Sequence, residues 1–125
     1  MTDTPRTPIE QLAALSPAAA KTFMDHRAAV MDNPDLQALA PKVKWLVGIG
    51  VAAALQSSTC TLMWVKQARK AGVTTAEIVE AIVVSRLMKF ATVNDTAADA
   101  LAWLAAQAEG PRPSNPGTRH GGTAL

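Results

Sequence analysis

The sequence predicts an all-α fold of five to six helices that assembles into an oligomer. Of the 125 residues, 49% are hydrophobic and only 4% are aromatic. Small aliphatic residues in such numbers suit closely packed helices better than sheets. Helix start and stop signals recur along the chain, and no alternating strand pattern appears between them. A chain this short buries a modest fraction of its surface, which leaves apolar faces for partner subunits.

The N-terminal part is expected to hold an arm and two helices. Residues 1–15 are predicted to form the arm and a short helix that starts at Ile9. Ser16 and Pro17 then give an N-cap and a first helical residue. This second helix should run to about Met31, because Asn33 and Pro34 interrupt it.

The next helix is predicted over residues 42–56, after Pro41, and it is apolar on almost every side. Such a helix is expected to be central and buried. Gly48 and Gly50 weaken helix propensity, so we expect them to allow the close approach of a neighbouring helix.

Three further signals place the C-terminal helices. A polar cluster at residues 56–59 starts a helix that ends before Gly72. Thr74 and Glu77 form a capping box, which opens a helix through Phe90. A last helix is expected over residues 93–108, and its predicted inward positions are Ala97, Ala100, Leu101 and Leu104. Residues 16–109 should thus form one helical domain, and residues 110–125, rich in Pro, Gly, Ser and Thr, a disordered tail.

Charge and cysteine content narrow the function classes. The formal net charge is only +2, which does not predict binding to nucleic acid. The longest apolar run, residues 43–55, contains Lys44 and is too short to cross a bilayer, so no membrane partner is expected. The N-terminus does not resemble a signal peptide, and a single cysteine favours a reducing compartment. These features favour a cytoplasmic location.

Cys60 is the only plausible reactive side chain. It lies near the predicted start of a helix, where free amides and the helix dipole favour a thiolate. Ser57 lies three residues before it and Trp64 four residues after it, so the three share a helical face. The alternative from composition alone is that Cys60 is a small hydrophobic residue packed against Trp64.

The order of these elements resembles the AhpD-like, carboxymuconolactone decarboxylase superfamily. An apolar helix, a polar elbow with a cysteine, a basic helix and then a Lys-Ala-Gly-Val-Thr stretch follow one another over roughly residues 41–104. The most specific part of the resemblance is residues 70–81. The resemblance to this superfamily implies a homotrimer or a homohexamer, and no cofactor is expected.

The resemblance also assigns the site. The redox-active branch carries a Glu, then Cys-x-x-Cys, then a His four residues after the second Cys. Cys60 matches the second cysteine. Three positions depart: Ser57 stands at the first cysteine, Trp64 at the histidine and Trp45 at the glutamate.

These departures leave three hypotheses. The first is a one-Cys peroxide-reactive protein or redox sensor that uses Cys60, with Ser57 beside it and an outside thiol as reductant, because no internal disulfide can form. The second is a non-catalytic member in which Trp45, Trp64 and Met88 line an apolar pocket or a subunit interface, so that the protein binds a small apolar ligand or serves as an assembly subunit. The third is a decarboxylase or isomerase of a lactone-type acid, but that branch keeps a His near the position of Trp64.

The remaining candidates are weaker. His26 is a possible base for Cys60 from an earlier helix, and His120 lies in the tail. The scattered methionines are expected to pack in the core, so no metal site is predicted. The last five residues, 121–125, could present a short apolar docking peptide to a partner; the alternative is a plain disordered end.

Overall fold

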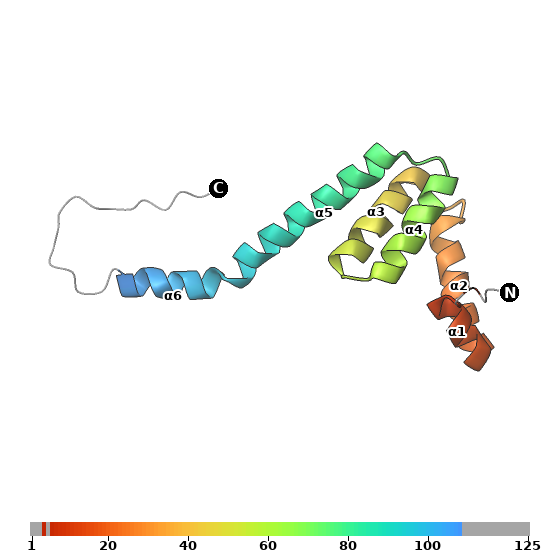
Figure 1. Ribbon diagram of the computed structural model, residues 1–125, viewed down its shortest axis with the longest axis horizontal. Helices are drawn as coiled ribbons and strands as arrows, with labels where there is room; N and C mark the ends of the chain where they lie inside the picture. Colours follow the sequence, from red (N-terminus) through yellow and green to blue (C-terminus); the bar gives the residue numbers. More distant parts are fainter. Residues whose placement is uncertain (1–3, 5, 109–125) are drawn as a thin grey trace. The chain divides into compact units, whose positions relative to one another are not determined.

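Every regular element in the part of the chain that the computed structural model describes, residues 4 and 6–108, is a helix (Figure 1). The predicted all-α class is therefore confirmed, with six helices in those residues. They are α1 (Pro8–Leu15), α2 (Pro17–Met31), α3 (Pro41–Ala54), α4 (Ser58–Lys70), α5 (Thr75–Thr96) and α6 (Ala98–Ala108). The expected disordered tail and its docking peptide lie outside the described residues.

The helix boundaries in the first three quarters of the chain follow the predicted capping signals. The Ser16 hydroxyl accepts a hydrogen bond from the backbone N–H of Ala19 and caps α2. Thr74 and Glu77 form the predicted capping box before α5. Gly72 adopts a φ of 90°, the left-handed conformation that a glycine after a helix provides.

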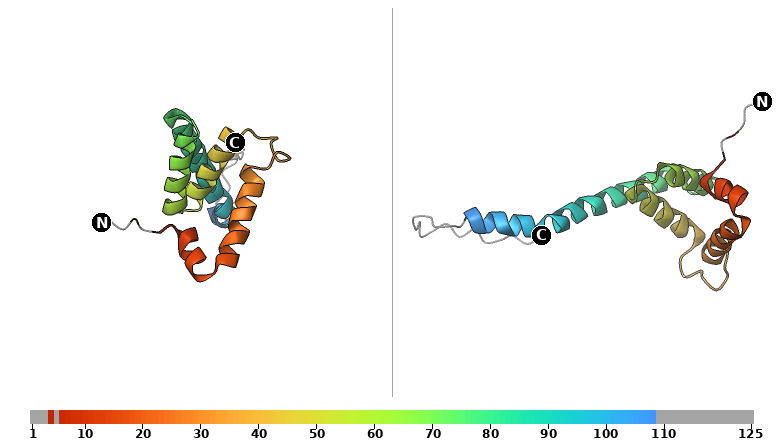
Figure 2. Two further views of the ribbon diagram at one scale, coloured as in Figure 1. Left: turned by 90° about the vertical axis from the view of Figure 1, so that its right-hand side faces the viewer. Right: turned by 90° about the horizontal axis from the view of Figure 1, so that it is seen from below.

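The chain divides into two compact units, Met1–Arg86 and Leu87–Leu125. In the first unit, α3 and α4 form an antiparallel pair and lie side by side in every view (Figures 1 and 2). Its core is small, with four buried residues that contact one another: Ile49, Ala68, Val73 and Ile78. Against this core pack four partly buried residues: Trp45, Leu46, Trp64 and Val65.

The two glycines of α3 permit close helix contacts, as predicted. A Cβ atom on Gly48 would lie 2.6 Å from ring carbons of Trp64 on α4. A Cβ atom on Gly50 would lie 2.6 Å from the hydroxyl oxygen of Ser85 on α5. Real Cβ atoms do not approach that closely, so a side chain at Gly48 would displace the Trp64 ring, and one at Gly50 would displace the Ser85 hydroxyl.

The predicted boundary between the last two helices was wrong. We expected one helix to stop at Phe90 and another to begin at Val93, but α5 continues to Thr96 and α6 begins at Ala98. The sequence between Phe90 and Ala98 holds no Gly or Pro to end a helix. The Thr92 hydroxyl donates to the carbonyl of Lys89 inside the helix rather than acting as a cap.

The expectation that α3 is a central, buried helix holds for only part of its surface. Ile49 is fully buried, whereas Val47 and Val51 are each 52% exposed. The predicted inward positions Leu101 and Leu104 of α6, in the second unit, are each 55% exposed. Helical periodicity identifies an apolar face, but it does not say whether the same chain covers that face.

In the described part of the chain, no helix combines the length and apolar character needed to cross a membrane.

Candidate functional site

The start of α4 positions Ser57 and Cys60. Ser57 is the N-cap, and its hydroxyl accepts a hydrogen bond from the backbone N–H of Cys60 at 3.3 Å. The Thr61 hydroxyl donates to the carbonyl of Ser57 at 2.6 Å. The Cys60 thiol is exposed. Ser57 therefore fixes the first turn of α4 by capping it, and the polar cluster at residues 56–59 predicted such a cap.

Trp45 and Trp64 contact each other between α3 and α4. Their ring centroids lie 4.8 Å apart with an interplanar angle of 63°, an edge-to-face arrangement. Such pairs contribute about 0.5–1.5 kcal/mol beyond the burial of their surface. Trp64 fits beside α3 because Gly48 leaves the room that a side chain would occupy. The structure thus brings together the two tryptophans that the resemblance places at the family's polar positions.

Arg27 of α2 completes this cluster. Its guanidinium carbon lies 5.8 Å from the ring centroid of Trp45 and 6.0 Å from that of Trp64. A cation over an indole face is attracted by the ring's quadrupole, with about 0.5–2 kcal/mol per contact. We call Arg27, Trp45 and Trp64 the indole cluster. Sequence reasoning missed the role of Arg27, although a charged residue on the apolar stripe of α2 with Phe23 and Val30 was the available signal.

His26 precedes Arg27 on α2 and is exposed. Consecutive helical residues point about 100° apart, so the residue that faces the indoles is Arg27 and not its neighbour. The role of His26 as a base for Cys60 stays a prediction.

Met88 lies in the second unit and is 58% exposed. The indole cluster lies in the first unit. A pocket that combines Met88 with the two tryptophans stays a prediction.

A cavity of about 440 Å³ opens at the end of the α3–α4 pair. Of the predicted site residues, Ser57 lines it. Its other walls come from Ala53, Gln56, Ser58, Thr61, Leu62 and Val65. The lining surface is mainly apolar, although the Gln56 amide and three hydroxyl groups also border it, so it suits a small apolar group better than a charged one.

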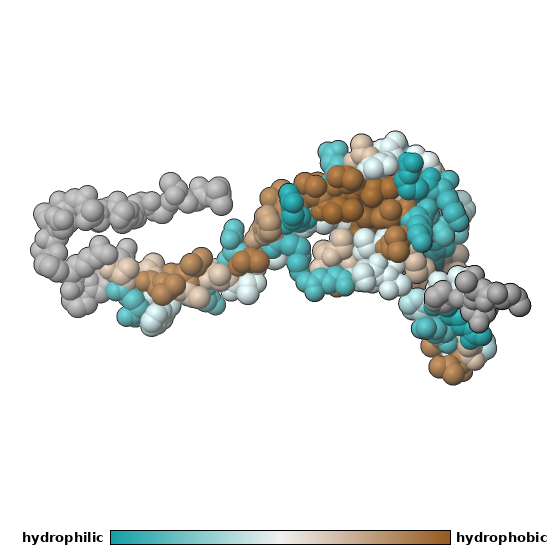
Figure 3. Space-filling view, in the orientation of Figure 1, coloured by the Kyte–Doolittle hydropathy of each residue, from teal (hydrophilic) through white to brown (hydrophobic). Residues whose placement is uncertain are grey.

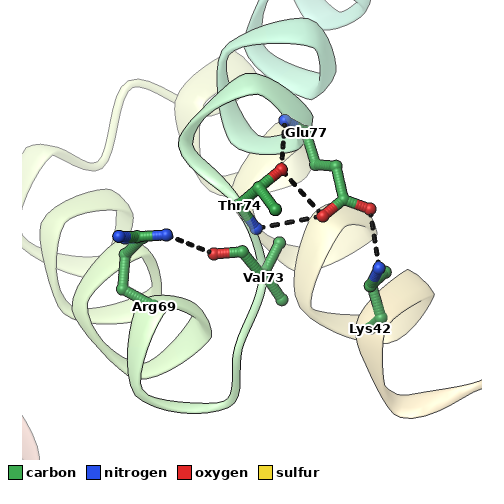
Figure 4. A network of polar contacts seen from close by, with 5 residues as sticks. All are labelled: Lys42, Arg69, Val73, Thr74 and Glu77. Atoms are coloured by element: carbon green, nitrogen blue, oxygen red, sulfur yellow. Dashed lines mark hydrogen bonds and ion pairs between the residues drawn. The ribbon is translucent and has the colours of Figure 1, made fainter.

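Among the described residues, Glu77 is the carboxyl group whose pKa departs most from its ordinary value, and it joins α5 to α3 (Figure 4). Lys42 donates to Glu77 at 2.9 Å, and the backbone N–H and hydroxyl of Thr74 donate to the other carboxylate oxygen. These contacts, that with Lys42 first, lower the pKa of Glu77 to about 2. Nearby, Arg69 donates to the carbonyl of Val73 at 2.9 Å. These contacts join the first turn of α5 to α3 and the end of α4 to the loop before α5, which indicates a structural role for the network.

Within residues 4 and 6–108, no three His, Cys, Asp or Glu side chains gather as ligands for a metal ion.

Comparisons with known proteins identify the class to which this fold belongs. The model of the carboxymuconolactone decarboxylase family matches residues 17–106, so the chain belongs to that family. A crystal structure of a protein from Methanobacterium thermoautotrophicum is similar, with 25% sequence identity and a TM-score of 0.66. The match covers 73% of this chain and 96% of the other. A comparison with curated proteins found no match.

Proposed function

We propose that this chain is a non-catalytic member of the carboxymuconolactone decarboxylase family that acts as an assembly subunit. The indole cluster carries the proposal. Trp45 and Trp64 occupy the positions that the resemblance assigns to the family's Glu and His, and they pack on each other under Arg27. The former active site is then a filled, structural contact.

The chemistry of these side chains supports the loss of the redox relay. An indole N–H donates a hydrogen bond but cannot accept a proton, and a guanidinium keeps its proton at all ordinary pH values. None of the three residues in the indole cluster can take the proton of a thiol. A cysteine in the family's redox branch depends on such a base to become a nucleophile.

The small core of the described chain supports the assembly role. Six hydrophobic residues of the described chain are buried, whereas more than twenty large ones are at least about one-third exposed. Soluble monomers rarely expose apolar surface in such amounts, and large exposed patches mark interaction sites. We propose self-association, as a homotrimer or a homohexamer by resemblance to the family.

A second candidate function rests on the exposure of Cys60 in the first turn of α4. In this alternative the Cys60 thiolate attacks the terminal oxygen of an organic hydroperoxide and the O–O bond breaks. The alkoxide that leaves takes a proton and becomes an alcohol. The sulfenic acid formed on Cys60 would then condense with an external thiol to a mixed disulfide and water, and a second external thiol would release Cys60. This cycle needs a thiol-rich, reducing compartment, in keeping with the expected cytoplasmic location.

The rate at which Cys60 reacts with an organic hydroperoxide decides between the two functions. The full chain would be compared with Cys60→Ser as the blank and with free glutathione at equal pH as the reference. We expect a rate no higher than that of the free thiol. A Cys60-dependent rate far above that of glutathione would overturn the non-catalytic proposal and establish the one-Cys alternative.

A further inference from the structure

We propose that the Arg27 guanidinium, held against Trp45 and Trp64, binds the oxyanion of a small organic molecule. The ligand carries a carboxylate or a phosphate group on an apolar body. This inference goes beyond the assembly role, because it gives the indole cluster a ligand whose binding needs no reactive thiol.

Arg27 carries a charge that has no anionic partner among the described residues. Neither ion pair of those residues includes it, and the groups that stabilise its charge are the rings of Trp45 and Trp64. The attraction between a cation and a ring face supplies no oxygen acceptor for the five guanidinium N–H groups. Arg27 is also half-buried, so part of its hydration is lost. An oxyanion would supply both the missing acceptors and the missing charge.

The donors of Arg27 are within reach of a ligand. In the described part of the chain, no side-chain nitrogen or oxygen is both buried and without a hydrogen-bond partner, so the guanidinium nitrogens reach the surface. The guanidinium is planar, and its fork of N–H groups matches two oxygens of a carboxylate or a phosphate. The indoles of α3 and α4 hold this fork in place, which lowers the entropy that binding costs.

The helices around Arg27 carry an excess of positive charge. The only acidic residue of α2, α3 and α4 is Asp25, and its carboxylate already pairs with Lys21 at 2.5 Å. Asp32 and Asp35 follow in the loop after α2. Against these three carboxylates stand seven basic residues of the three helices: Lys21, Arg27, Lys42, Lys44, Lys66, Arg69 and Lys70. Figure 3 shows hydrophilic surface gathered where α2 and the end of α4 lie. Such a surplus raises the local concentration of small anions.

The residues of α2 beside Arg27 favour a ligand with an apolar body. Phe23 and Met24 lie four and three residues before Arg27, so they share its side of the helix. They are 52% and 45% exposed. An apolar group attached to the oxyanion would lie against these side chains and gain from their burial. The combination of one guanidinium with an apolar surround suits a small amphipathic acid better than nucleic acid, whose phosphates call for a row of cations.

The test titrates the full chain with benzoate and with phenyl phosphate, and follows the indole N–H resonances by NMR. The resonances of Trp45 and Trp64 should shift and saturate, whereas that of Trp103, in the second unit, should not. Saturation with benzoate alone would assign a carboxylate, with phenyl phosphate alone a phosphate, and with both a general oxyanion site. Benzamide, a neutral molecule of the same shape as benzoate, should leave all three resonances unchanged. Equal shifts with benzamide, or none with either anion, would overturn the proposal.

A pair of matched variants locates the site. Arg27→Gln should weaken the binding of the anion about tenfold or more, because a charge-assisted contact is lost. Arg86→Gln removes the same charge from an exposed position of α5 and should change the affinity by less than about twofold, because solvent and salt screen it. Equal affinities of Arg27→Gln and the wild type, or equal losses in both variants, would overturn a site at Arg27.

The comparison of benzoate with benzamide uses the wild-type chain, so it decides the question even if Arg27→Gln does not fold. Neither measurement involves the Cys60 thiol or the mass of the assembly. A failure to bind the anions would therefore leave the proposed function standing, and a fast hydroperoxide reaction would leave the anion site standing.

Discussion

At the residue scale, the indole cluster depends on the missing side chain of Gly48. The ring of Trp64 occupies the space into which a Cβ atom would project, at a separation of 2.6 Å. Composition and periodicity identify Gly48 as a residue of low helix propensity within a predicted helix. The residue that fills the space beside it, Trp64, belongs to a different helix, and the periodicity of one helix does not predict contacts with another. A contact of this kind is visible only once the two helices are packed.

We expect Gly48→Ala to destabilise the protein. The steric conflict with Trp64 costs about 1–3 kcal/mol, because overpacking forces a shift of ring or backbone. The better helix propensity of alanine returns about 1 kcal/mol. The net loss should appear as a lower urea midpoint, followed by tryptophan fluorescence or circular dichroism.

The matched control for this substitution is the same change in a Trp64→Leu background. With the indole removed, Gly48→Ala should be neutral or should stabilise the chain by up to about 1 kcal/mol. An equal loss in both backgrounds would mean that Gly48 serves some purpose other than room for the ring.

At the scale of elements, the start of α5 is both predicted by the sequence and coupled to another helix. The Thr74–Glu77 capping box is a local motif, and four consecutive residues suffice to identify it. The partner Lys42, which lies on α3, is not part of that motif. The end of α5 is the opposite case, in which the sequence does not predict the boundary. The segment between Phe90 and Ala98 holds no Gly or Pro, so no local signal marks where α5 ends and α6 begins.

This network predicts a pH dependence of stability. The folded-state pKa of Glu77, about 2, lies below its ordinary value of 4.5, so the unfolded chain binds a proton before the folded chain does. The stabilisation is therefore complete above about pH 4.5 and is lost as the pH falls towards 2. We expect Glu77→Gln to lower the urea midpoint at pH 7, with a difference from wild type that shrinks as the solution is acidified to about pH 2.

Glu80→Gln serves as the comparison, because Glu80 lies on the same helix, is exposed and joins no ion pair among the described residues. It should leave the pH profile close to that of the wild type. Parallel profiles for Glu77→Gln and the wild type over this pH range would argue against a stabilising role for the ionised Glu77.

At the scale of the whole molecule, the small core predicts that folding and association are linked. A partner that binds only the folded chain raises its apparent stability by mass action. The midpoint of thermal unfolding should therefore rise with chain concentration. Calorimetry at several concentrations measures this dependence. A midpoint that is constant across concentration would indicate a chain that folds as an independent monomer.

Local sequence was enough to predict the helical class, the caps of α2, α4 and α5, the family and the candidate thiol, because each depends on residues within a few positions or on one specific stretch. Which apolar faces are covered, and which side chains meet in the site, followed from the packing of the helices. Arg27 over the two indoles, Gly48 beside Trp64 and Lys42 on Glu77 join different helices. The helical repeat fixes the direction in which each side chain points from its own helix. The residue that it contacts on another helix is fixed only when the two helices pack together.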